Sequence, residues 1–192
     1  MKVLGIHHVT AVSSKIVENL EFYTGVLGMR LVKKSVNQDD VSAYHLFYAD
    51  TVGSPGTDLT FFDWPSIQSN RPGVATVSLT TLRVAGSSLK AWEQRLKQHG
   101  VVAEWDLDRK GRDRLTFADP EGQQLALVDD TGLANQVVPW SKMVPEEMAI
   151  RGIFGVDLDS ARPDSTKKVL TELMGFEDVD GTRFVINGEH HS

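Results

Sequence analysis

A pattern that occurs three times along the chain limits its possible folds more than any other feature of the sequence. Each copy opens with a strand-like run, continues through an amphipathic helical stretch and ends that stretch at a glycine, at Gly28, Gly100 and Gly175. Short strand-like runs separated by turn residues follow each glycine. A repeat of this kind predicts one supersecondary unit per copy.

The repeat predicts two complete units and a shorter third one. We place them at residues 1–67, 73–130 and 148–192. The predicted fold class is α+β: tandem βαβββ modules that form curved, mainly antiparallel sheets with the helices on their convex faces, the third module being incomplete. The third module lacks a counterpart of the last strand, which would leave an unpaired sheet edge. Of the two explanations, a strand supplied by a partner and a longer natural protein, we favour the longer protein.

The first unit shows how the prediction is made. Its opening run, Val3–Ser13, is rich in β-branched residues, and Ser14 is a plausible helix N-cap. Gly28 ends the helix as a C-cap glycine. The apolar residues that follow helical spacing on one face are Ile16, Leu20, Tyr23 and Leu27.

The composition excludes several classes of protein. The chain of 192 residues has 41% apolar and 24% charged residues, which is typical of a globular protein. It has no cysteine, so disulfides and thiolate metal sites are excluded, and no run approaches the ~20 apolar residues of a membrane helix. The net charge of -6 argues against nucleic acid and anionic membranes as partners. We expect a cytoplasmic protein, and the sequence is compatible with a homo-oligomer.

Two adjacent histidines, His7 and His8, occur in the first unit and have no counterpart in the other two. Successive strand residues face opposite sides, so the two rings cannot line the same cavity. We match His8 with Thr76 in unit two, a polar position, and His7 with Ala75, an apolar one. This match predicts that His8 faces the concave side of the sheet and that position 7 packs under the helix.

The residues alone do not show a complete metal site. A carboxylate ligand is expected at the centre of the last strand of each module, where the sequence has Thr60 and Ala126. His45 lies on an apolar strand, which favours a structural role, and His99 is expected at the surface. The remaining histidines, His190 and His191, lie at the chain end, where a metal site formed in trans together with Glu189 is the weakest alternative.

The sequence also resembles a known superfamily. A βαβββ module with a histidine in its first strand is typical of the vicinal oxygen chelate superfamily, which includes glyoxalase I, extradiol dioxygenases and bleomycin-resistance proteins. The strings HHVT, NLEFYTGVLGMRLVKKSV, YHLFYAD and VGSPGTDLTFFDWP resemble the ring-cleaving dioxygenases that open hydroquinones.

This resemblance implies a protein of four modules that binds Fe(II) through two histidines and one glutamate. His8 matches the histidine ligand of the first module, and the other two ligands belong to the fourth module. His7 and Thr10 would be catalytic neighbours of the metal, and the partners would be a small aromatic substrate and O2. Phe61, Phe62 and Trp64 could enclose the ring. Because a single imidazole holds Fe(II) weakly, we expect the 192 residues alone to be a poor metalloenzyme.

Two other interpretations stay open. Thr60 and Ala126 at the expected carboxylate positions favour a metal-free module that binds a small apolar molecule. A third, weaker interpretation is another metal-dependent enzyme of the superfamily, such as a glyoxalase-like lyase or isomerase.

Overall fold

The computed structural model describes residues 3–36, 43–67, 73–133 and 137–186. Its strands are β1 (His8–Ser13), β2 (Arg30–Val36), β3 (Tyr44–Ala49), β4 (Asp58–Asp63), β5 (Thr76–Val84), β6 (Ala103–Leu107), β7 (Asp113–Ala118), β8 (Gln124–Asp129), β9 (Ile153–Asp159), β10 (Glu177–Asp178) and β11 (Phe184–Val185). Its helical segments are α1 (Ile16–Leu20), η1 (Glu21–Val26), η2 (Gly86–Ser88), α2 (Leu89–Gln98), η3 (Glu146–Met148), α3 (Pro163–Lys168) and η4 (Val169–Leu173).

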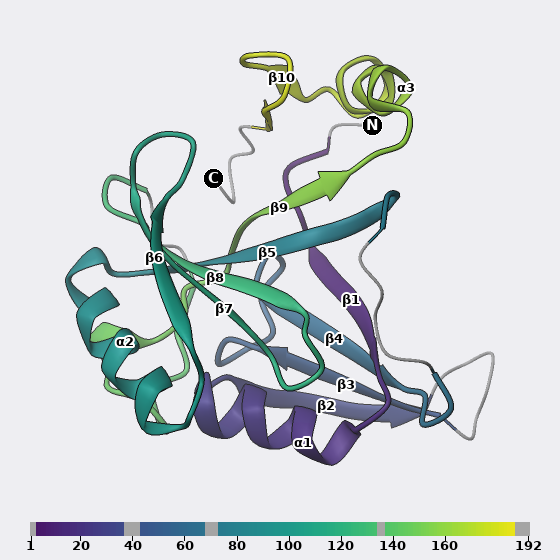
Figure 1. The fold of residues 1–192 in the computed structure, drawn as a ribbon. Coiled ribbons are helices and arrows are strands. Elements are labelled where there is room, and N and C mark those ends of the chain that lie inside the picture. The colour runs from purple at the N-terminus through teal and green to yellow at the C-terminus, as the bar shows by residue number, and fades with distance from the viewer. Residues whose placement is uncertain (1–2, 37–42, 68–72, 134–136, 187–192) are drawn as a thin grey trace.

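The strands of the first two modules form two sheets (Figure 1). The first has the strand order β1-β4-β3-β2, and the second has the order β6-β7-β8-β5-β9. In both, the first strand of the module runs parallel to the last strand, as in β1–β4 and β5–β8, and the other neighbours are antiparallel. The predicted α+β class with mainly antiparallel sheets is therefore confirmed.

The helices of modules one and two pack into one shared hydrophobic core. Tyr23 and Leu27 of the first module are fully buried, while Ile16 and Leu20 pack against the same core, as the helical spacing predicts. Trp92 on α2 is also fully buried, and its indole N–H donates to the carbonyl of Met148 at 2.8 Å. Burial of these side chains is the main favourable contribution to folding.

Polar contacts join the first two modules at the edge of this core. The guanidinium of Arg95 on α2 donates to the carbonyls of Val26 and Gly25, at 2.7 and 2.6 Å, where the first helix ends. The hydroxyl of Tyr23 donates to a carboxylate oxygen of Asp119 at 3.2 Å. The helical segment of the first module is therefore bound both to α2 and to the β7–β8 turn.

The third module is attached to the second sheet through its first strand. β9 pairs antiparallel with β5, and the short strands β10 and β11 form a separate two-stranded sheet. Figure 1 shows α3 and β10 at the far end of β9, away from α1 and α2. Among the described residues, the third module thus has no curved sheet of its own.

The predicted N-cap role of Ser14 is wrong. The helix begins at Ile16 with Lys15 at the cap position and no side-chain cap hydrogen bond. Ser14 is instead bound to the second module: its amide and its hydroxyl both donate to Oε1 of Glu121, at 2.8 and 2.6 Å. The hydroxyl of Ser13 donates to Oε2 of the same carboxylate at 2.5 Å. A long-range acceptor has replaced the local cap, which spacing within one module cannot predict.

This carboxylate predicts a measurable link between the modules. Glu121→Ala removes the acceptor of three hydrogen bonds, so we expect the free energy of unfolding to fall by about 2 kcal/mol at pH 7. Glu121→Gln should lose about half as much, because the amide keeps one oxygen acceptor. Urea denaturation of wild type, Glu121→Gln and Glu121→Ala should give free energies of unfolding that decrease in this order. Equal values for all three proteins would contradict the prediction.

The same link should weaken in acid. Burial opposes ionisation of Glu121, but the hydrogen bonds from Ser13 and Ser14 outweigh it and hold the pKa of this carboxyl below its ordinary value. Its contribution is therefore complete above the unfolded-state pKa of about 4.3 and is lost as the pH falls through the lower folded-state value. Burial and, to a lesser extent, the charge of Glu121 raise the pKa of Asp119, so the difference between wild type and Glu121→Gln reports the coupled contribution of the two carboxyl groups.

Candidate metal and substrate site

Strand β1 separates a core face from an open face. Val9 and Ala11 pack against the hydrophobic core, whereas His8 and Thr10 are exposed on the opposite side of the strand. His7 precedes the strand and is exposed as well. The prediction that position 7 packs under the helix is therefore wrong, because the alternation of faces begins only at His8.

The two histidine rings contact each other. Their Nδ1 atoms are 3.1 Å apart, and the rings lie at 90° with centroids 5.2 Å apart. A hydrogen bond between two such nitrogens requires a proton on one and a lone pair on the other. When His8 is the donor, its Nε2 carries the free lone pair that a metal ion needs. The amide of Gly56 donates to the carbonyl of His7 at 2.7 Å and fixes the backbone at this point.

Thr10 is held from the neighbouring strand. It pairs with Thr60 in the parallel β1–β4 ladder, and the two hydroxyl oxygens are 2.9 Å apart. Thr60 is buried, so its hydroxyl is available to Thr10 and not to solvent. This contact fixes the position of the Thr10 side chain next to His8 on the same face.

The carboxylate nearest to His8 in the ladder is one that sequence analysis missed. The register pairs His8 with Asp58, not with Thr60. Burial raises the pKa of Asp58, although the charges of His7 and His8 act in the opposite direction, and its Oδ1 is buried with no hydrogen-bond partner in the described part of the chain. The only signal in the sequence is an acidic residue at the start of the last strand of the module, and its meaning depends on the register of a long-range pair.

The match between the repeats also needs correction. Thr60 and Ala126 occupy equivalent positions in the last strands of the two modules. Thr60 pairs with Thr10, and Ala126 pairs with Thr81, so Thr81 is the counterpart of Thr10. The counterpart of His8 is therefore Leu79, not Thr76. Val77, which the earlier match places under the helix, is 44% exposed. The error arises because the start of β5 extends to pair with β9, so the two first strands differ in length.

Aromatic side chains occupy the same face further from His8. Phe62 pairs with Val12 of β1 and with His45 of β3, and Phe47 pairs with Thr60. Directly opposite residues share a face, so these rings lie on the side of Thr10. Phe61 faces the other way and is buried in the core, and Trp64 is 43% exposed just beyond β4.

The described residues fit an iron site only in part. His8 and Asp58 provide one imidazole and one carboxylate on one face, both of which Fe(II) accepts as ligands. Within the described ranges, no group of three or more His, Asp or Glu side chains is placed to hold a metal. His99 is exposed after α2, as expected, and Glu189, His190 and His191 lie outside the described residues.

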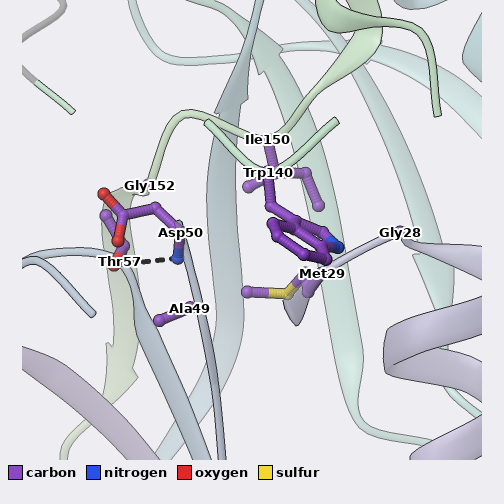
Figure 2. A pocket seen from close by; sticks show the side chains of 8 residues that line it. All are labelled: Gly28, Met29, Ala49, Asp50, Thr57, Trp140, Ile150 and Gly152. Atoms are coloured by element: carbon purple, nitrogen blue, oxygen red, sulfur yellow. Dashed lines mark hydrogen bonds between the residues drawn. The ribbon is translucent and has the colours of Figure 1, made fainter. Parts of the chain in front are cut away.

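A separate shallow pocket lies between the first module and the segment that leads to β9. Figure 2 shows Trp140 and Ile150 of that segment close to Met29, with Asp50 and Thr57 nearby. The carboxylate of Asp50 in this pocket has a structural role, because its Oδ1 accepts hydrogen bonds from three backbone amides of the β3–β4 turn. This pocket is a junction between segments and contains none of the predicted site residues.

The fold agrees with the family comparison. Residues 5–127 match the family described as Glyoxalase/Bleomycin resistance protein/Dioxygenase superfamily. The chain therefore belongs to this superfamily. No helix in the described part of the chain is long and apolar enough to cross a membrane.

Two curated relatives of the chain carry the names of dioxygenases. MhqA of Bacillus subtilis (strain 168), whose name assigns it to these enzymes, is 43% identical over 93% of this chain and 57% of its own length. A chlorohydroquinone/hydroquinone 1,2-dioxygenase of Sphingobium indicum is 30% identical over 79% of this chain and 48% of its own length. The chain thus spans about half the length of the curated relatives it matches.

Solved structures agree with the computed fold. A Bacillus subtilis protein described as a dioxygenase has a TM-score of 0.90 and 36% identity, covering 98% of this chain and 61% of that one. A glyoxalase family protein from Enterococcus faecalis has a TM-score of 0.55 and 19% identity, covering 65% of this chain and 97% of that one, and shows the fold alone.

Proposed function

We propose that the protein is an Fe(II)-dependent, extradiol-type ring-cleaving dioxygenase that acts on hydroquinone-like aromatic compounds in the cytoplasm. The observation that carries the proposal is the exposed His8 on the open face of β1, with its Nδ1 in contact with His7. The names of the relatives support the reaction class. The proposal applies to the whole protein, for which these residues provide one metal ligand.

Each residue of the site has a proposed role. Bound iron would hold the ionised phenol hydroxyl and O2 next to each other and pass electron density between them. His8 would bind the metal through Nε2, and its Nδ1–H would donate a hydrogen bond to Nδ1 of His7, which would fix the orientation of the His8 ring. The Thr10 hydroxyl, held by Thr60, would contact the substrate beside the metal. The remaining histidine and glutamate ligands would belong to a fourth module, as the resemblance implies.

The second candidate function is metal-free binding of a small aromatic molecule. One observation favours it: the described residues contain no group of three metal-binding side chains. In this case the open face of the first sheet would bind a ring without cleaving it.

Measurement of O2 uptake separates the two functions. With Fe(II) and methylhydroquinone, a version of the protein extended by the implied fourth module should consume one O2 for each ring opened. The 192 residues alone should retain well under one iron per chain and consume little O2, because they offer one imidazole and at most one carboxylate. Binding of methylhydroquinone that is independent of iron, with no O2 uptake in either protein, would establish the metal-free function instead.

A further inference from the structure

The imidazole of His45 lies between two phenyl rings. Its centroid is 4.0 Å from that of Phe47, two residues along β3, and 3.9 Å from that of Phe62, its direct neighbour on β4. All three side chains are only partly buried. They form a short aromatic row, His45, Phe47 and Phe62, on the open face of the first sheet.

This aromatic row belongs to the face that carries the proposed metal ligand. The pairing of Phe62 with Val12 and of Phe47 with Thr60 places the row beside β1. Electrostatics agrees with this placement: burial, then the charge of Lys33, then the charge of His8 lower the pKa of His45. His45 and His8 therefore lie on the same face of the first sheet.

The imidazole has a hydrogen-bonding atom for which no described residue of the protein is a partner. Nε2 of His45 is shielded from solvent and has no hydrogen-bond partner among the described residues. A buried polar atom without a partner costs about 1–3 kcal/mol. A phenyl ring at position 45 would pack against the same neighbours without this cost. The imidazole therefore reduces stability and keeps a polar atom ready for a partner from outside the chain.

A cation lies at the end of the row. The ammonium of Lys33 is 5.3 Å from the centroid of Phe47, and Lys33 pairs with Phe47 across β2 and β3. A positive charge beside aromatic rings favours electron-rich aromatic ligands, including phenols. The row therefore offers ring contacts, one unused nitrogen and one cation, which together fit a hydroxylated aromatic ring.

We propose that His45 is a substrate-binding residue that hydrogen-bonds one hydroxyl of a dihydroxybenzene while the other hydroxyl is directed toward His8. The ring of the ligand would pack against Phe47 and Phe62, one of which must rotate to expose Nε2. The identity of the ring rests on the proposed function. His45 would then select rings whose two hydroxyls are well separated, as they are in hydroquinones, over rings with adjacent hydroxyls.

Binding to the 192-residue chain under anaerobic conditions tests this role. The probes are methylhydroquinone and 1,4-dimethylbenzene, which has a similar ring without hydroxyls. In His45→Phe, the affinity for methylhydroquinone should fall about tenfold, as expected for loss of one net hydrogen bond. The affinity for 1,4-dimethylbenzene should stay unchanged. His99→Gln, at the exposed end of α2, should behave as wild type with both probes.

A spectroscopic measurement distinguishes binding from a structural role. Methylhydroquinone should shift the ¹⁵N signal of His45 Nε2 in wild type, and 1,4-dimethylbenzene should not. If His45→Phe does not fold, His45→Gln replaces it in the binding test. Because glutamine keeps a polar group, this variant should retain part of the wild-type affinity for methylhydroquinone. Equal affinity of wild type and His45→Phe for methylhydroquinone, or an unshifted Nε2 signal, would overturn the inference.

The test of the His45 role and the test of the proposed function can fail independently of each other. Binding that depends on His45 without O2 uptake in the extended protein would support the inference and reject the dioxygenase proposal. O2 uptake that is unaffected by His45→Phe would support the dioxygenase proposal and reject the inference. Failure of the wild-type chain to bind methylhydroquinone would also reject the inference about His45.

Discussion

His8→Ala should remove metal binding and activity together in an iron-loaded form of the enzyme that contains the implied fourth module. This substitution removes one of the three proposed protein ligands, so we expect iron content near zero and activity more than about 100-fold lower. His7→Ala should keep measurable iron while lowering activity about 10- to 100-fold, because it removes a group that orients the ligand and not the ligand itself. Elemental analysis and O2 uptake of the two variants check this difference.

His99→Ala is the matched control, since it removes an exposed imidazole far along the chain from β1. It should match wild type in iron content and activity. Equal iron content in wild type and His8→Ala would show that His8 is not a ligand. Loss of iron in His7→Ala with retention in His8→Ala would exchange the two roles.

The elements of the fold were predictable because their signals are local. The helical spacing from Ile16 to Leu27 and the glycine that follows depend on neighbouring residues, and both agree with the structure. Gly28 has a φ of +70°, a conformation that favours glycine at the end of a helix. The open side of His8 was predicted from its match with Thr76, a match that the ladders correct to Leu79, so the side is right although the match is wrong.

The errors concern contacts between distant segments. Ser14 is bound by Glu121 of the other module, and His8 is paired with Asp58 through a parallel register. Neither contact follows from local spacing in the sequence, because each joins segments that are far apart along the chain. The shifted match of His8 with Thr76 has the same origin, because pairing with β9 extends β5 beyond the length of β1. Predictions from the resemblance, namely the roles of His7, His8 and Thr10, stay predictions.

The segment before β9 has a structural connection to the site. The carbonyl of Gly56 accepts the amide of Ile153 at 2.7 Å, while the amide of Gly56 donates to the carbonyl of His7 at 2.7 Å. One residue of the β3–β4 turn therefore joins the start of β9 to the backbone beside His8. Gly152, next to Ile153, is buried against this turn.

Gly152→Ala should therefore weaken both the fold and the site. Gly152 has a φ of +119°, and a Cβ at this position would lie 2.7 Å from the carbonyl oxygen of Gly56. We expect the free energy of unfolding to fall by about 3 kcal/mol, because backbone strain and displacement of the turn add together. Gly111→Ala is the matched control: its φ is +75°, but no atom of the described residues lies within 4 Å of the added Cβ, so it should lose only about 1 kcal/mol.

Urea denaturation measures the two losses, and NMR of the histidine rings tests the connection to the site. Displacement of Gly56 moves the carbonyl of His7, so the ring signals of His7 and His8 should shift in Gly152→Ala and stay in place in Gly111→Ala. Equal losses of stability in the two variants would mean that the turn accommodates the methyl group without moving. Unchanged histidine signals in Gly152→Ala would mean that the backbone at His7 is held by other contacts than Gly56.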